Sequence, residues 1–222
     1  MEALGIIGMV IGIIAIVVVT IIIARHFEKK RTEALLKAAE EMGLTFAEDH
    51  DNSVHSKVSG FTVFNKGHSR KMKNVIKGVT DEVEIAIFDY QYTTGSGKHQ
   101  NTYKYSIASL HSPLLSCPHF TMRPEGLFDK VGGALGFQDI DFDTHPNFSR
   151  MFVLKGQDEE GVRKYFGPTV LEFFESRKNV TLEAKPGSLI FHVGRRVKPE
   201  NLKDLLEDAY QIFGVLVDQK QA

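Results

Sequence analysis

The chain has 222 residues and a formal net charge of −1 at pH 7, because 27 Lys and Arg residues nearly balance 28 Asp and Glu residues. This balance argues against nucleic acid as a principal partner, since proteins that bind the phosphate backbone carry a clear excess of positive charge. The single cysteine excludes an internal disulfide and is typical of a protein in a reducing compartment.

The first predicted element is an apolar stretch from residue 4 to residue 24, in which Thr20 is the only polar side chain. As a helix it would reach about 31 Å, which matches the thickness of a bilayer hydrocarbon core. Only Met1, Glu2 and Ala3 precede it, so it lacks the positively charged region that opens a cleavable signal peptide. We therefore interpret residues 1–24 as a retained transmembrane anchor in the lipid bilayer.

Four basic residues follow the predicted span: Arg25, Lys29, Lys30 and Arg31. The positive-inside rule places such a flank on the cytoplasmic side, so we expect the N-terminus outside and the C-terminal part in the cytosol. Basic side chains are also attracted to an anionic membrane surface. We interpret the four residues as a stop-transfer signal at the membrane surface, with specific lipid recognition as the alternative.

Small residues recur along one face of the predicted span, at Gly5, Gly8, Gly12 and Ala15. Gly8 and Gly12 match the small-xxx-small pattern through which membrane helices approach one another closely. The pattern predicts association of the span with itself or with another membrane protein. The alternative is that these glycines reflect only the general frequency of glycine in membrane helices.

A helical pattern continues beyond the span, because residues 28–42 lack Pro and Gly and repeat apolar residues at steps of four and three. Gly43 is a typical residue for the end of such a helix. We predict a juxtamembrane helix over residues 25–45 that continues the anchor. A single cytosolic domain over residues 46–222 should follow, and it is long enough for a core of ordinary size.

Residues 44–46, at the start of that domain, are predicted to be extended, and strand-like segments fill its first half at residues 61–64, 75–79, 83–92, 103–110 and 120–122. The segment 83–92 is apolar or aromatic on both faces, which is typical of a central strand. Gly95 and Gly97 supply a turn from this segment into the next one. Together these features predict an antiparallel sheet.

The second half of the domain alternates strands with helices. We predict an extended segment at 151–154, helices at 158–166 and 168–174, a hairpin of 180–183 with 188–193, and a terminal helix at 199–217. Pro168 suits the first turn of its helix, where a missing N–H is tolerated. The expected fold class is therefore α+β, a mainly antiparallel sheet with helices in the C-terminal half.

The glycine-rich segment at 94–98 invites comparison with a phosphate-binding P-loop. That motif needs a glycine where this chain has Tyr92, and a Ser or Thr where it has His99. It must also open a helix, whereas the residues that follow are strand-like. We reject nucleotide binding there and expect no cofactor.

The densest group of potential metal ligands is Asp139, Asp141 and His145. Alternate carboxylates on an extended backbone project to one side, so the group is a candidate site for Mg²⁺ or Mn²⁺. It does not match an EF-hand, which needs Gly and Glu where this chain has Thr144 and Arg150. The alternative is that these acidic residues cap helices or pair with neighbouring bases.

Two other features are interpreted as structural. Cys117 would be nucleophilic only with a histidine placed against it, so we expect a buried and inert thiol. Arg195 and Arg196 follow a predicted strand, and we expect them to pair with acidic residues near the terminal helix, at Glu200, Asp204 or Glu207.

Four segments together resemble an uncharacterised family of bacterial membrane-anchored proteins: FDYQYTTGSGK at 88–98, FTMRPE at 120–125, DIDFDTHPNFS at 139–149 and DEEGVRKYF at 158–166. The resemblance covers nearly the whole chain and implies a single-pass protein of the bacterial plasma (inner) membrane. It implies no established activity and transfers no catalytic residue.

The sequence contains no motif that assigns an activity, so an enzyme is the less favoured class. We expect a membrane-tethered cytosolic interaction or scaffold module, with a protein partner or a second copy bound through the transmembrane helix. Two alternatives stay open. One is a metal-assisted enzyme that uses the cluster from Asp139 to His145, and the other is a lipid or small-ligand sensor that reports through the juxtamembrane helix.

Overall fold

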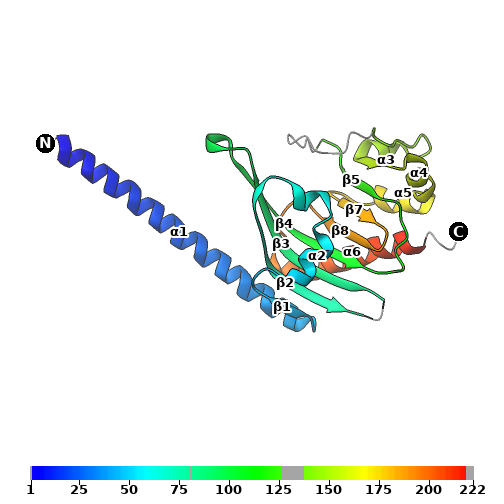
Figure 1. Ribbon diagram of the computed structural model, residues 1–222, viewed down its shortest axis with the longest axis horizontal. Helices are drawn as coiled ribbons and strands as arrows, with labels where there is room; N and C mark the ends of the chain where they lie inside the picture. The colour runs from blue at the N-terminus through cyan, green and yellow to red at the C-terminus, as the bar shows by residue number, and fades with distance from the viewer. Residues whose placement is uncertain (1, 81, 127–137, 219–222) are drawn as a thin grey trace.

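The computed structural model describes residues 2–80, 82–126 and 138–218. Its helices are α1 (Glu2–Glu41), α2 (Asn52–Val58), α3 (Pro146–Met151), α4 (Glu159–Tyr165), α5 (Pro168–Glu175) and α6 (Leu202–Val217), with 3-10 turns η1 (Thr62–Asn65), η2 (Gly97–His99) and η3 (Pro199–Asn201). Its strands are β1 (Thr45–Ala47), β2 (His68–Val79), β3 (Glu84–Thr94), β4 (Asn101–His111), β5 (Phe120–Pro124), β6 (Phe152–Gly156), β7 (Thr181–Lys185) and β8 (Ser188–His192). The predicted α+β class is confirmed, because a long apolar helix precedes an antiparallel sheet with its helices (Figure 1).

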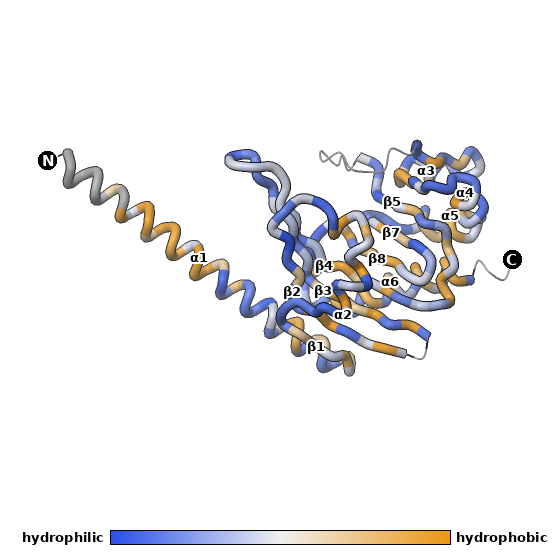
Figure 2. Tube along the Cα trace, viewed as in Figure 1, coloured by the Kyte–Doolittle hydropathy of each residue, from blue (hydrophilic) through white to orange (hydrophobic). Residues whose placement is uncertain are grey.

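Helix α1 joins the apolar N-terminal segment to the rest of the chain without a break, as predicted. It ends before Gly43, whose φ of 69° suits glycine, and the Leu44 N–H donates to the Ala39 carbonyl at 2.9 Å. By length and composition, α1 is the one helix in the described part of the chain that fits a membrane span. Figure 2 shows its apolar half standing away from the sheet, while Leu35 and Ala39 near its end are buried in the core.

The described strands form one sheet in the order β1-β2-β3-β4-β8-β7-β5-β6, and every neighbouring pair is antiparallel. Strands β2, β3 and β4 are consecutive hairpins, and the predicted turn between β3 and β4 uses Gly95 and Gly97 with φ of 75° and 56°. Beyond β4 the spatial order departs from the chain order. The C-terminal hairpin β7–β8 therefore lies between β4 and the pair formed by β5 and β6.

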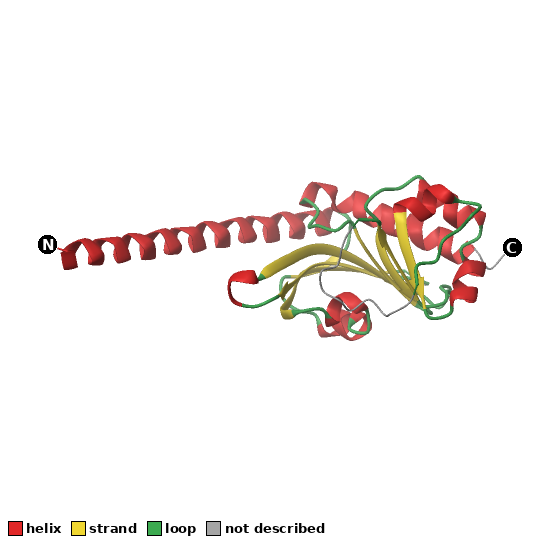
Figure 3. Ribbon diagram, turned by 90° about the horizontal axis from the view of Figure 1, so that it is seen from above, coloured by secondary structure: helices red, strands yellow, loops and turns green. Residues whose placement is uncertain are grey.

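The sheet separates two apolar layers of different extent (Figure 3). One face packs against α3, α4, α5, α6 and the end of α1. The core on this face contains six fully buried phenylalanines among the described residues: Phe120, Phe148, Phe152, Phe166, Phe174 and Phe191. On the other face α2 and η1 lie mainly over β2, β3 and β4, where Phe61 and Phe64 pack with Phe88. The remaining strands are less covered there by the described residues.

Strand β3 lies in the middle of this arrangement and is buried on both faces, as its pattern predicted. Ile85 and Ile87 enter the helix-covered core, while Ala86 and Phe88 enter the layer under α2 and η1. Side chains therefore alternate between the two layers, as the period of a strand requires.

One predicted strand, at residues 61–64, is wrong, because residues 62–64 belong to η1 and Phe61 is the residue that precedes it. Val63 and Phe64 are adjacent and both are buried in the same layer. Adjacent residues of a strand point to opposite faces, whereas a tight helical turn directs both toward the sheet.

Two short helices were not predicted. Helix α2 has few apolar residues, and the Oδ1 of Asp51 caps it by accepting from the N–H groups of Ser53 and Val54 at 2.9 and 3.1 Å. Helix α3 begins at Pro146, directly after the acidic segment that was considered for metal binding. Both are too short for a helical period to stand out in the sequence.

Candidate functional site

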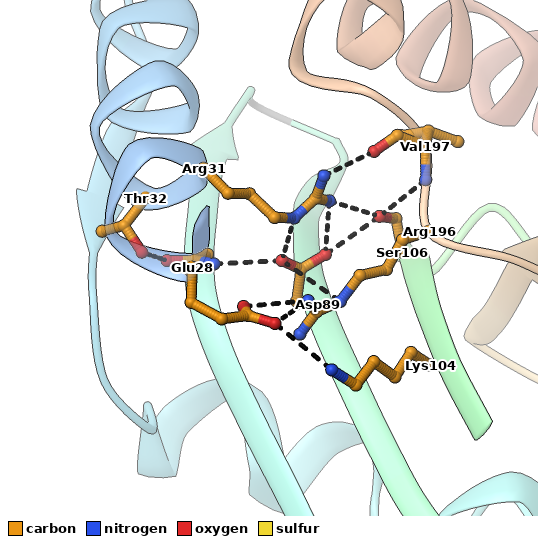
Figure 4. A network of polar contacts seen from close by, with 9 residues as sticks. Glu28, Arg31, Thr32, Asp89, Lys104, Ser106, Arg196 and Val197 are labelled. Carbon is orange, nitrogen blue, oxygen red and sulfur yellow. Dashed lines mark hydrogen bonds and ion pairs between the residues drawn. The ribbon is translucent and has the colours of Figure 1, made fainter. Parts of the chain in front are cut away.

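A cluster of charged groups around one buried carboxylate connects α1 to the sheet (Figure 4). At its centre the Asp89 carboxylate on β3 has a side chain only 2% exposed. Arg31 on α1 binds it with two parallel contacts, Nε to Oδ2 at 2.7 Å and Nη2 to Oδ1 at 2.8 Å. Asn74 and Ser106 donate to the same carboxylate, each at 3.0 Å. We call these residues, with Glu28, Lys104 and Arg196, the α1 junction.

The second half of the α1 junction lies around Glu28. Arg196, in the segment that follows β8, contacts both Glu28 carboxylate oxygens at 2.8 and 2.9 Å, and Lys104 on β4 contacts one of them at 3.2 Å. Arg196 also approaches Asp89, with Nε 3.7 Å from Oδ2. The junction therefore joins α1 to β3, to β4 and to the segment after β8.

Opposite charges hold the acidic groups of the junction in their ionised form. Burial by itself would raise the pKa of Asp89, but the Arg31 guanidinium, the nearby Arg196 and the Asn74 amide more than offset it, so the pKa lies below its ordinary value. Burial likewise opposes ionisation of Glu28, and Arg196 and Lys104 hold its pKa below the usual range. We interpret the junction as structural, because its charges satisfy one another.

The junction changes two expectations. Arg31 was expected in the basic flank at the membrane surface, but its side chain is 15% exposed and is bound to Asp89. The expected partners of Arg196 were also wrong, because Glu200 pairs with Lys198 and Glu207 pairs with Lys203, while Arg196 binds Glu28. The membrane-surface role of Arg25, Lys29 and Lys30 stays a prediction.

The acidic segment shows bonds within the protein. Asp139 Oδ1 accepts from the N–H of Leu154 at 2.8 Å, and burial raises the pKa of its carboxyl group. The Asp141 carbonyl accepts from Arg163 at 2.5 Å, and the His145 ring lies 3.0 Å from the Thr144 hydroxyl. Within the described ranges, no three His, Cys, Asp or Glu side chains are grouped closely enough to hold a metal ion. Metal binding there stays a prediction.

Two other sequence predictions can be placed. Cys117 is 2% exposed, and burial raises the pKa of its thiol to about 12, as expected for an inert side chain. On α1, Gly12 has no neighbouring atom where a Cβ would stand, and Ala15 is exposed. The surroundings of Gly5 and Gly8 lie outside the described residues. Helix association through this face stays a prediction.

A cavity of about 260 Å³ lies on the less covered part of the sheet, opposite the helix layer. Strands β3, β4, β5, β6, β7 and β8 contribute to its lining, and η1 and the segment after it form one side. Its volume is near the lower end of the range of about 300–1,000 Å³ for small-molecule sites. The cavity can therefore hold a head group or a short length of chain.

Aromatic rings form the wall of the cavity that β3 and β4 provide. The rings of Tyr92 and Tyr103 stack at 5.1 Å between centroids, and Tyr105 stacks on His192 of β8 at 4.6 Å. Val63, Val153 and Ile190 add aliphatic surface to the lining. This part of the cavity suits apolar groups or the flat faces of small rings.

Polar groups lie on the strands across the cavity from the tyrosines. Thr121 and Arg123 of β5, Lys155 of β6 and Glu183 of β7 all line it. Glu183 is bound by Thr62, whose N–H and hydroxyl donate at 2.9 and 3.0 Å, and it lies 3.1 Å from the His119 ring. The cavity therefore combines an aromatic wall with a basic and hydroxylated one.

The patterns in the sequence did not predict this cavity, although one signal for it is present. Polar residues occupy alternate positions in two strands, at Thr121 and Arg123 and at Thr181 and Glu183, and Lys155 lies on the same face of a third strand. Such alternation is ordinarily read as a solvent-facing side of a sheet. Only the strand order places these side chains beside the tyrosines of β3 and β4.

Comparison with known proteins gives a likeness of fold. No family model matches the chain, and no curated protein matches it in sequence. The crystal structure of the mycobacterial trehalose monomycolate transport factor A, TtfA, resembles it with a TM-score of 0.57 over 85% of this chain and 93% of that chain. The two sequences are 10% identical, so the similarity is one of fold alone.

Proposed function

We propose that this protein is a membrane-anchored lipid-binding protein that takes part in lipid transport, with α1 as its anchor and the cavity as its ligand site. The observation that carries the proposal is the composition of the cavity. Its tyrosine wall suits the apolar part of an amphipathic molecule, and its basic and hydroxylated wall suits a polar head group. The proposal develops the lipid-sensor alternative from the sequence.

The exposed apolar surface of α1 supports the anchor. Large aliphatic side chains such as Ile11, Ile16 and Ile22 are at least 60% exposed, and together they would be poorly tolerated in water. A bilayer covers such a surface fully. The basic residues Arg25, Lys29 and Lys30 favour a cytosolic location for the domain.

The placement of the sheet relative to α1 supports access to lipid. In Figures 1 and 3 the tip of the β3–β4 hairpin points toward the side of the molecule on which the N-terminal part of α1 lies. Tyr92 and Tyr103, near that end of the hairpin, line the cavity. A cavity that begins there would face the membrane, and the α1 junction would hold it in that orientation.

The likeness to TtfA adds support of a different kind. That protein is described as a trehalose monomycolate transport factor, and its fold resembles this chain over most of both lengths. A shared fold does not transfer a ligand. It supports lipid transport as the general role, while the ligand must be argued from the cavity of this chain.

Photo-crosslinking in membranes tests the proposal. The full-length chain is reconstituted into phosphatidylcholine vesicles that contain a trace of the same lipid with a diazirine near its glycerol end, and labelled peptides are mapped by mass spectrometry. We expect label on α1, from the bilayer, and on the strands that line the cavity. Label on α1 without label on those strands would contradict the proposal.

Two variants make the test specific. Thr121→Trp places a large side chain in the cavity on a strand that tolerates aromatic residues, so label should disappear from the cavity strands and persist on α1. Thr45→Trp makes the same change at an exposed position of β1, at the far edge of the sheet, and should leave both sets of label intact.

A protein-interaction role is the second candidate, and the open surface around Gly12 on α1 favours it. Gly12→Ile should reduce self-association of the full-length chain in a membrane reporter assay. Val17→Phe, on the opposite face of the helix, serves as the control. Equal association of both variants with wild type would remove this candidate.

A further inference from the structure

We propose that the cavity selects lipids whose head group carries a net negative charge, and that Lys155 and Arg123 are the residues that recognise it. This inference rests on the proposed function, because it names the ligand class of the same cavity. The shared chemistry is an anionic oxygen group, as in a phosphate or a carboxylate, and the source we assign is a lipid.

Strand register places the two cations on the same face of the sheet. Lys155 of β6 is directly opposite Thr121 of β5, and Arg123 is two residues further along β5. The two residues are therefore diagonal neighbours across the β5–β6 pair. Such neighbours are about 7–8 Å apart, and their Cβ atoms are somewhat closer. An anionic group between them would meet the guanidinium fork of Arg123 on one side and the ammonium group of Lys155 on the other.

The charge balance of the cavity favours an anion. Its described lining contains three basic residues, Lys66, Arg123 and Lys155, and one carboxylate, Glu183. Lys66 and Arg123 also interact with other residues of the chain, and Arg123 Nη1 donates to the Pro124 carbonyl at 3.2 Å. Glu183 is only 8% exposed at its side chain and is already bound by Thr62 and His119. The Lys155 side chain forms no hydrogen bond or ion pair with another residue of the described ranges, so its charge is available to a ligand.

The aromatic wall alone would suit a different head group, because rings of tyrosine also attract quaternary ammonium groups. Three basic residues in the same lining oppose a cationic head group by repulsion. The tyrosines are therefore assigned to the apolar part of the ligand, and the β5–β6 side of the cavity to the charged part.

The test compares two lipid probes that share a phosphodiester and differ in the alcohol attached to it: glycerol, which leaves a net negative charge, or choline, whose ammonium group cancels that charge. The full-length chain is reconstituted with diazirine lipids of identical acyl chains, one a phosphatidylglycerol and the other a phosphatidylcholine, each as a trace in the same neutral vesicles. The measured quantity is label on the cavity strands divided by label on α1. We expect this ratio to be about three- to tenfold higher for the anionic probe, the range of a charge-assisted hydrogen bond at a partly exposed site.

Variants at position 155 test whether Lys155 causes the preference for the anionic probe. In Lys155→Gln, the ratio of cavity label to α1 label should fall for the anionic probe toward the value for the zwitterionic probe, and the ratio for the zwitterionic probe should not change. Lys155→Arg should keep the preference for the anionic probe. Lys164→Gln, at an exposed position of α4 in the helix layer, is the matched control and should match wild type.

The possible outcomes separate the two proposals. Cavity label of equal strength with both probes would overturn the head-group inference and leave lipid binding intact. The absence of cavity label with either probe would overturn both. Loss of the anionic preference on adding inorganic phosphate, but not sodium chloride of the same ionic strength, would assign the site to a free anion and overturn the lipid source.

Discussion

The α1 junction and the cavity are both charged regions of the same sheet, but they differ in how their charges are matched. At the junction, Arg31 and Arg196 face Asp89 and Glu28 at hydrogen-bonding distances. In the cavity, the Lys155 side chain has no hydrogen-bond or ion-pair partner within the described ranges, and the one carboxylate of the described lining, Glu183, is bound by Thr62 and His119. Charges matched within the chain stabilise the fold, whereas a charge without a partner in the chain, at a concave site, is suited to a ligand.

The largest predicted effect is at the centre of the junction. Asp89→Ala leaves Arg31 and Arg196 close to each other without the buried carboxylate, which should lower the free energy of unfolding by about 3–5 kcal/mol. Thermal unfolding of the full-length chain in detergent, followed by circular dichroism, measures the loss. Asp49→Ala is the control, because Asp49 is highly exposed and its contact with Lys73 at 3.7 Å should contribute less than about 1 kcal/mol. Equal losses of stability in Asp89→Ala and Asp49→Ala would show that the buried carboxylate contributes no more than an exposed one.

Removing the main partner of Asp89 should have a smaller effect. In Arg31→Met the carboxylate keeps its contacts with Asn74 and Ser106 and the nearby charge of Arg196, so we expect a loss of about 2–3 kcal/mol. Lys30→Met, one residue earlier on α1 and exposed, should change stability by less than about 0.5 kcal/mol. A loss for Lys30→Met as large as for Arg31→Met would mean that the effect comes from α1 in general.

Glu183 is a cavity residue that should behave like the junction. Its carboxylate binds the Thr62 N–H and hydroxyl, so Glu183→Ala should cost about 1–3 kcal/mol by leaving those donors without their acceptor. Glu172→Ala, at an exposed position of α5, is the control. If the two variants unfold at the same temperature, the contact between η1 and β7 does not stabilise the fold.

Protonation of the junction carboxylates should lower the free energy of unfolding by less than their truncation does, because a protonated carboxyl group keeps its shape. The folded-state pKa values of Asp89 and Glu28 lie below their ordinary values, which are about 3.9 and 4.3 in unfolded chains. Their contribution is therefore complete above those unfolded values and is lost as the pH falls below them. Unfolding temperatures measured from pH 7 to pH 3 should decline more steeply for wild type than for Asp89→Asn. If the unfolding temperatures of wild type and Asp89→Asn decline in parallel, protonation of Asp89 does not contribute to the loss of stability in acid.

Local patterns predicted the helices and hairpins better than they predicted either charged region. The continuity of α1, the end at Gly43 and the two-sided burial of β3 follow from short-range periodicity. Arg31 and Asp89 are 58 positions apart in the chain, and Arg196 and Glu28 are 168 apart. No local pattern indicates such pairs, so Arg31 was assigned to the membrane surface and Arg196 to the terminal helix.

The cavity was missed for a related reason, since its walls meet only through the strand order. Alternation along β5 and β6 indicates which side chains share a face, but not that this face remains partly uncovered. The placement of β7 and β8 between β4 and β5 brings the basic residues of β5 and β6 to the same face as Tyr103 and Tyr105. This crossover is a long-range feature that the chain order of the strands does not indicate.

The smallest predicted effect on stability is at Lys155. Because this side chain is partly exposed and forms no ion pair with another described residue, Lys155→Gln should change the free energy of unfolding by less than about 0.5 kcal/mol. The same thermal unfolding that detects Asp89→Ala measures it, and Lys164→Gln provides the baseline for loss of a surface charge. A loss comparable with that of Glu183→Ala would show that Lys155 supports the fold. Its charge would then belong with those of the junction, and the contrast between the two regions would no longer hold.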